Sequence, residues 1–204
     1  MPFHIKRKWE FLTLKTNKMA YPKITVNTGL ALKVIASDTL PIPSPDLPVL
    51  SGATTAAVVS KLVDAGADFS SVSVGDIIYN TTGTTSASVT AVDSTTILSV
   101  SADIFIAAQD YTIYLGGPNG SSRMTSAEGC LLYVGSTASI VQDITAGAAG
   151  TADPRYIDIS VTTVTGSTIT FENFKVGDYL PIQITNLNVT GTDVNVLNSC
   201  IAIW

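Results

Sequence analysis

Short runs that alternate apolar with hydroxyl-bearing residues, separated by Gly and Asn turns, dominate the last third of the chain. Alternation with a period of two places the apolar side chains on one face of a strand. Five such runs predict one antiparallel β-sandwich, and they cover residues 130–135, 167–171, 176–182, 189–192 and 201–204. The expected fold class is therefore all-β, with a jelly-roll-like sandwich as its main part.

A second group of short runs lies between residues 51 and 115. The runs recur at a spacing of about ten residues, which predicts a small β-barrel or sandwich module inserted into the first sandwich. Within this module, residues 102–108 are the one stretch predicted to form a helical turn. Asp103 is placed to favour the start of that turn.

A proline-rich stretch follows two predicted strands at residues 23–27 and 31–35. Prolines between positions 41 and 48 fix φ and remove amide donors, so this stretch should be an extended arm that cannot join the centre of a sheet. Two interpretations remain open. The arm is either a strap across a neighbouring subunit or a plain connector between domains.

The expected domain organisation has five parts. They are a basic tail at 1–20, N-terminal strands with the proline-rich arm at 21–50, a small inserted β module at 51–115, a Gly/Ser linker at 116–129, and the β-sandwich at 130–204. Gly75 and Gly177 each stand before an Asp at the start of a predicted strand. We expect both glycines to take the positive-φ position of a turn, with Asp76 and Asp178 binding nearby amides.

Charge is divided unevenly along a chain whose net charge is −5. The first 23 residues contain six basic side chains and one acidic side chain, so a basic tail precedes an acidic body. Basic arms can bind nucleic acid. The competing interpretation is a disordered tail, or an upstream extension of the reading frame before Met19, and we expect no nucleic-acid partner. No apolar run has the roughly 18 residues that a membrane span requires, so no membrane partner is expected either.

Reactive chemistry is sparse in the sequence. The single histidine, His4, lies in the tail, which excludes Ser–His and Cys–His nucleophile pairs from the body. Cys130 and Cys200 are predicted to be free, buried thiols. Most acidic residues are solitary turn positions, although a glycan-cleaving or peptidoglycan-cleaving pair of Asp side chains remains an enzymatic alternative. We expect no catalytic, metal or cofactor site.

Four motifs follow one another along the second half of the chain. They are Leu132-Tyr133-Val134-Gly135, the run 169–182 with Leu180-Pro181, Thr190-Gly191-Thr192, and the final Ile201-Ala202-Ile203-Trp204. Together with residues 29–35, this order resembles the spike-base family of tailed phages and gene-transfer particles. Residues 74–114 are separately similar to a module in virion structural proteins of marine and cyanobacterial phages. The spike-base resemblance covers about half of the chain.

The resemblance implies a non-enzymatic subunit that multimerises on a phage head, as a decoration or cement protein or as a spike base. Its implied partners are the major capsid protein, copies of itself in a trimer or pentamer, and a spike or fibre protein. Its implied location is the surface of the virion head, after synthesis in the host cytoplasm. The alternative function is a receptor-binding or tail-fibre adhesin that recognises host glycans.

Strand-borne tyrosines allow either a glycan contact or a place in the core or at a subunit contact. The candidate interface residues combine the proline-rich arm, three of these tyrosines and the last residue, and they are Pro41, Ile42, Pro43, Pro45, Leu47, Pro48, Tyr79, Tyr111, Tyr114 and Trp204.

Overall fold

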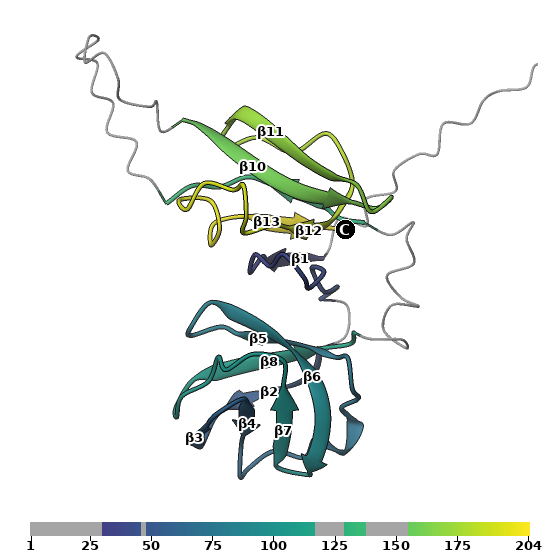
Figure 1. The fold of residues 1–204 in the computed structure, drawn as a ribbon, viewed down its shortest axis with the longest axis vertical. Coiled ribbons are helices and arrows are strands. Elements are labelled where there is room, and N and C mark those ends of the chain that lie inside the picture. The colour runs from purple at the N-terminus through teal and green to yellow at the C-terminus, as the bar shows by residue number, and fades with distance from the viewer. Residues whose placement is uncertain (1–29, 46–47, 117–128, 138–154) are drawn as a thin grey trace, which may run out of the picture.

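The structure is a computed structural model that describes residues 30–45, 48–116, 129–137 and 155–204. These residues form two β-rich lobes, one above the other in Figure 1. The insert lobe contains residues 48–116, and the sandwich lobe contains the other three ranges. The prediction of an all-β antiparallel fold is confirmed. The predictions for the tail at 1–20, the strand at 23–27, Leu47 and most of the linker lie outside the described residues.

The insert lobe is built on one antiparallel sheet with the strand order β2-β8-β5-β6-β7-β4-β3. The strands are β2 (Pro48–Ala53), β3 (Ala56–Val58), β4 (Lys61–Val63), β5 (Ile77–Asn80), β6 (Thr85–Ser94), β7 (Ile97–Val100) and β8 (Asp110–Tyr114). The two end strands, β2 and β3, follow each other in the chain and are not paired with each other. The sheet is therefore open, and the barrel alternative for this module is not observed.

Alternating side chains give the insert lobe its own core. Leu98 and Val100 on β7 point inward, while the alternate residues Ile97 and Ser99 are only half-buried. The inward side chains meet those of the other strands and of the 3₁₀ turn Phe69–Ser71, and the largest of them is Tyr111. The Tyr111 hydroxyl donates a hydrogen bond of 2.8 Å to Asp64 Oδ2, so this buried polar group is satisfied.

The sandwich lobe contains two sheets of three strands, with the orders β1-β13-β9 and β11-β10-β12. The strands are β1 (Ala31–Lys33), β9 (Leu131–Tyr133), β10 (Tyr156–Thr163), β11 (Thr168–Lys175), β12 (Ile184–Leu187) and β13 (Ile201–Ile203). An isolated bridge from Cys130 to Ile184 connects the two sheets, and a second from Tyr133 to Tyr179 joins β9 to the segment between β11 and β12. β1 reaches this lobe from the other end of the chain and pairs with β13, so that Leu32 lies opposite Ala202.

Several local predictions differ from the structure. Residues 176–182 and 189–192 were predicted as strands, but the first run is a turn with a single bridge at Tyr179 and the second is a turn. The strands β10 and β12 were not predicted at all. Residues 102–108 form a loop with no helical turn. The loop is instead bound to the rest of the lobe: Asn80 Nδ2 donates to Ile104 O at 2.7 Å, and the Asp103 side chain accepts from the Ser60 amide.

The predicted turns and thiols are confirmed. Gly75 has a φ of 95° and Gly177 a φ of 87°, and Asp76 and Asp178 each accept a hydrogen bond from a nearby backbone amide. Cys130 and Cys200 are free and buried in the core of the sandwich lobe. Burial raises the pKa of each thiol to about 12, so both thiols stay protonated at neutral pH.

Candidate functional site

The proline-rich arm lies against its own chain. Ile42 is only 1% exposed and belongs to the core of the sandwich lobe, and Pro43 is buried beside it. The Ile42 amide donates to Thr185 O at 2.7 Å, so the arm runs along the outer side of β12. Pro41 and Pro45 are half-buried, and Pro48 begins β2. The arm therefore covers a sheet edge of its own subunit, and the buried Ile42 is not available to a neighbour.

The three candidate tyrosines are all buried. Tyr111 lies in the insert lobe core, while Tyr79 and Tyr114 form an edge-to-face pair with ring centroids 5.4 Å apart. This pair packs with Ile35 and Ile77 where the two lobes meet, and we call this cluster the seam. No sugar ring can stack on these three tyrosines in this conformation. Trp204, the last candidate, is half-buried and packs against the core of the sandwich lobe.

Tyr79 differs from Tyr111 in its hydroxyl group. The Tyr79 side chain is 2% exposed, and its hydroxyl has no hydrogen-bond partner among the described residues. The backbone of Ile35 lies near it, without the geometry of a hydrogen bond. Burial raises the pKa of Tyr79 far above its usual range, so the hydroxyl is neutral at any physiological pH.

A cleft of about 460 Å³ opens beside the seam. Segments of both lobes line it, five of its eleven lining residues are Ser or Thr, and Asp38 is its one charged residue. The Asp38 carboxylate is already engaged, because it accepts hydrogen bonds from the amides of Val189 and Thr190 and from the Thr190 hydroxyl, at 2.8 to 2.9 Å. These bonds, first of all the one from the Thr190 amide, hold the pKa of Asp38 below its usual range. Asp38 thus clamps the arm to the turn after β12.

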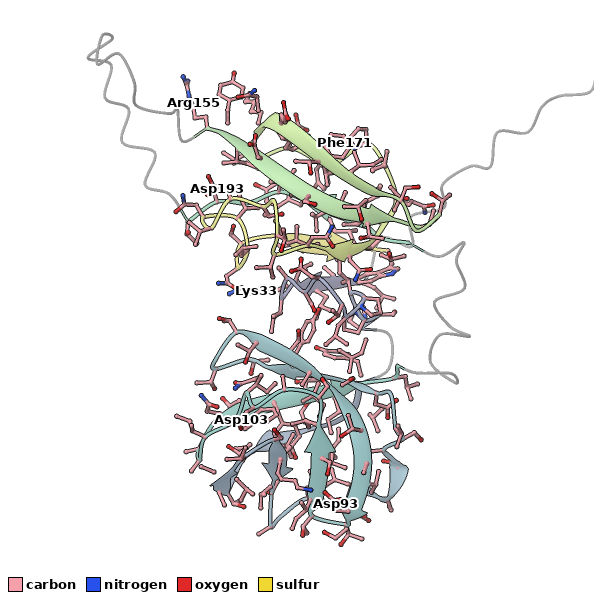
Figure 2. All side chains as sticks on the ribbon, viewed as in Figure 1. Lys33, Asp93, Asp103, Arg155, Phe171 and Asp193 are labelled. Atoms are coloured by element: carbon pink, nitrogen blue, oxygen red, sulfur yellow. The ribbon has the colours of Figure 1, made fainter. Side chains whose placement is uncertain are left out.

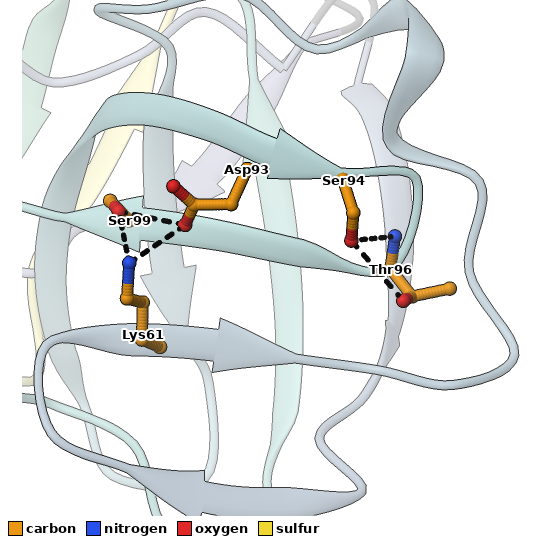
Figure 3. A network of polar contacts seen from close by, with 5 residues as sticks. All are labelled: Lys61, Asp93, Ser94, Thr96 and Ser99. Carbon is orange, nitrogen blue, oxygen red and sulfur yellow. Dashed lines mark hydrogen bonds and ion pairs between the residues drawn. The ribbon is translucent and has the colours of Figure 1, made fainter.

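The remaining polar clusters are structural too. On the surface of the insert lobe, Lys61 Nζ lies 2.8 Å from Asp93 Oδ2, and the Ser99 hydroxyl binds both groups (Figure 3). Hydrogen bonding to Lys61 lowers the pKa of Asp93. Across the described ranges, no three His, Cys, Asp or Glu side chains are grouped closely enough to hold a metal ion. In the same ranges, no helix has the length and hydropathy needed to cross a bilayer.

The surface that the sequence did not reveal is the outer edge of β11. β11 ends the sheet β11-β10-β12, and most of its eight residues are exposed. Phe171 marks its position at the top of the sandwich lobe in Figure 2. The run 167–171 was predicted as a strand, but a strand's place within its sheet depends on contacts that alternation does not report. Comparison of the chain with protein-family models, with curated proteins and with solved structures finds no match.

Proposed function

We propose that this chain is a non-enzymatic structural subunit of a phage virion, a decoration or cement protein or a head spike base. In this role it binds the major capsid protein and copies of itself on the surface of the phage head, and a spike or fibre protein is a further partner. The proposal rests on the position of the motifs that resemble the spike-base family, which all lie in the sandwich lobe.

The motifs that resemble the spike-base family are scattered along the sequence but lie together in space. Leu132 and Tyr133 are on β9, the run from Ile169 includes β11, and the terminal apolar run forms β13. The arm and β1 join the same lobe from the N-terminal side of the insert. The segments that carry the resemblance therefore build one sandwich, and this single observation carries the proposal.

The insert lobe fits the same role. It is formed by one continuous stretch of chain with its own core, and it meets the sandwich lobe at the small apolar seam (Figure 1). A lobe connected in this way can project from a shell while the sandwich lobe binds it. The adhesin alternative would need another aromatic surface, because Tyr79, Tyr111 and Tyr114 are buried.

The arm cannot serve as a removable strap in the test of this proposal. Deletion of residues 38–48 would remove the Asp38 clamp and take Ile42 out of the core. Such a variant is expected to unfold the sandwich lobe, so loss of particle binding would carry no information about an intersubunit contact.

The direct test uses the intact chain. Mass spectrometry of purified particles from the phage that encodes it should detect the chain in stoichiometric amounts. Particles that lack it should bind the purified chain saturably in a co-sedimentation assay, with heat-unfolded chain as the control. Absence of the chain from particles, together with no binding to them, would contradict the proposal.

A further inference from the structure

β10 determines which backbone groups of β11 face away from the sheet. The Ser160 carbonyl accepts from the Asn188 amide, so the even-numbered residues of β10 direct their backbone groups toward β12 and the turn after it. The Thr163 amide donates to Ser167 O at 2.9 Å, so the odd-numbered residues of β10 face β11. The odd-numbered residues Ile169 and Phe171 lie opposite Val161 and Ile159 and complete this ladder.

It follows that the even-numbered residues of β11 point outward. Thr168, Thr170 and Glu172 direct their amide and carbonyl groups away from β10. Within the described part of the chain, no hydrogen bond is made to these groups. Three donors and three acceptors thus stand in a row along the edge, which is a template for another strand.

The same edge exposes apolar surface. Ile169 is 40% exposed, and Phe171 and Phe174 pack against the core of the sandwich lobe while remaining half-buried. The sheet β1-β13-β9 on the other side of the core therefore covers these side chains only in part. A strand added at this edge would bury more of their surface and gain hydrophobic free energy.

In the sandwich lobe, the other end strands are short or covered. The arm binds the outer side of β12 through the Ile42 amide, and residues 177–180 bind β9 through the Leu180 amide and Leu132 O. β1 has only three residues, and Leu32 at its centre packs against the seam. In the insert lobe, Asp103 binds the Ser60 amide next to the three-residue β3, and β2, with six residues, pairs only with β8 among the described residues. β11, with eight residues, is the longest end strand of either lobe, and its regular run 168–172 has no partner on the outward side among the described residues.

We infer that β11 is a self-association edge, on which β11 of a second copy pairs antiparallel about a two-fold axis at Thr170. The inference rests on the proposed function and names the surface for the self-association that this function requires. The product is a continuous sheet across two subunits, in which strand edges cover each other. A two-fold contact of this kind is complete in a dimer. The number of copies on a particle would therefore depend on other surfaces of the protein.

The register follows from shape and charge. A bulge opposite Asp158 ends the regular run of β11, so the regular outward-facing run is 168–172 and its midpoint is Thr170. Pairing about this midpoint sets Thr168 against Glu172 and Ile169 against Phe171 of the second copy. The two Glu172 side chains are then about 13 Å apart along the strands, which exceeds the screening length of about 8 Å at physiological ionic strength. Pairing about Glu172 would instead bring two carboxylates face to face.

The experiment measures the mass of the intact chain by sedimentation velocity between 1 and 100 µM, as roughly the range in which weak self-association is resolved. The wild-type chain should form dimers. Thr170→Lys and Thr170→Glu should each raise the dimer dissociation constant at least about tenfold, since each places two like charges directly opposite each other. An equimolar mixture of the two variants should dimerise again, because the facing charges are then opposite. Thr90→Lys, which adds the same charge to an exposed position on β6, should dimerise like the wild type.

A cysteine pair tests the register. Thr170→Cys should form a disulfide-linked dimer under mild oxidation, because facing Cα atoms in a hydrogen-bonded pair are about 5.5 Å apart. Thr168→Cys should not, because its copies would be about 13 Å apart. The native Cys130 and Cys200 are buried, so they should not form disulfides between copies under these conditions.

The inference is overturned if the wild-type chain is monomeric throughout this range. It is also overturned if Thr170→Lys dimerises like the wild type, or if mixing the Lys and Glu variants restores nothing. Restored dimers in the mixture also show that both variants are folded. A monomeric wild-type chain that still binds particles would reject the edge and keep the proposed function, so the two failures are distinguishable.

Discussion

The two lobes are assembled differently from the chain. The insert lobe folds from one continuous stretch, and Asp103 in its loop 101–109 binds the Ser60 amide beside the short end strand β3. The sandwich lobe is assembled from segments on both sides of the insert, and its eight-residue end strand β11 has no partner on its outer edge among the described residues. Covered edges keep a β lobe from pairing with other chains, whereas a bare edge invites pairing. We therefore expect the proposed self-association to depend on the sandwich lobe and not on the insert lobe.

A second contrast separates the interior of a lobe from the seam. Inside the insert lobe, the Tyr111 hydroxyl binds Asp64, and the Asp64 carboxylate also accepts from the Gly66 amide. At the seam, the Tyr79 hydroxyl is equally buried and has no partner among the described residues. A buried hydroxyl without a partner lowers the free energy of unfolding. The buried hydroxyl inside the insert lobe is therefore expected to stabilise the fold, and the one at the seam is not.

The largest expected effects come from cavities in the two cores. Leu62→Ala in the insert lobe and Ile159→Ala in the sandwich lobe each truncate a fully buried side chain, at an expected cost of about 2 to 5 kcal/mol in unfolding free energy. Because the apolar contact between the lobes is small among the described residues, calorimetry should show two unfolding transitions, and each variant should lower a different one. If each variant lowered both transitions equally, the lobes would be one cooperative unit and the comparison would fail.

Substitution of Tyr111 and of Tyr79 by Phe should give the next largest difference in unfolding free energy. Tyr111→Phe should destabilise the insert lobe by about 1.5 to 3 kcal/mol, because the buried Asp64 loses its hydroxyl donor. Tyr79→Phe removes a hydroxyl that has no partner, so the expected change lies within about 0.5 kcal/mol or is stabilising. Urea unfolding of both variants measures the difference. Equal losses would mean that the seam hydroxyl is satisfied after all.

Much of the fold follows from alternation, which the sequence displays directly. The pattern of β7 and the terminal apolar run of β13 predict strands because each buries one face. β10 was missed although Ile157, Ile159 and Val161 alternate with polar residues in the sequence. The sequence also does not show that Ser160 is buried between its two buried apolar neighbours. Ser160 is tolerated there because its hydroxyl accepts from Asn188 Nδ2 at 3.1 Å, a contact between residues far apart in the sequence.

The candidate surface was harder to predict from the sequence, because it also depends on contacts between residues far apart in the chain. The prolines predict an extended arm, but the burial of Ile42 depends on a core built by distant strands. The tyrosines predict strand positions, but which face of the sheet is covered depends on the second lobe. The bare edge of β11 is a property of strand order, and strand order is set by long-range pairing that local periodicity does not encode.

The Asp38 clamp gives a smaller effect with a distinct pH dependence. Asp38→Ala should destabilise the sandwich lobe by about 1 kcal/mol at neutral pH, because the carboxylate is near the surface and solvent weakens its hydrogen bonds. The pKa of Asp38 is lowered from 3.8 in the folded state. Its contribution is therefore complete above the unfolded pKa and is lost as the pH falls through the folded pKa.

Thermal unfolding of the sandwich lobe between pH 2 and pH 6 measures this dependence. The wild type should lose more stability than Asp38→Ala below about pH 4, near the unfolded pKa of an Asp. Parallel pH profiles for the two chains would mean that the clamp contributes no stability. The insert lobe, which does not contact Asp38 through hydrogen bonds, serves as the internal control.

Removal of the surface ion pair of the insert lobe should have the smallest effect on stability. This variant tests whether buried contacts alone stabilise that lobe. Lys61→Met removes the ion pair with Asp93 while keeping an apolar side chain on β4. Both charged side chains are about one-third exposed, so water and salt screen their attraction, and the expected shift in melting temperature is below about 1 °C. Melting curves of wild type and variant in low and high salt measure it. A shift of several degrees that disappears in high salt would show that surface charges, as well as the buried Tyr111 bond, hold the insert lobe together.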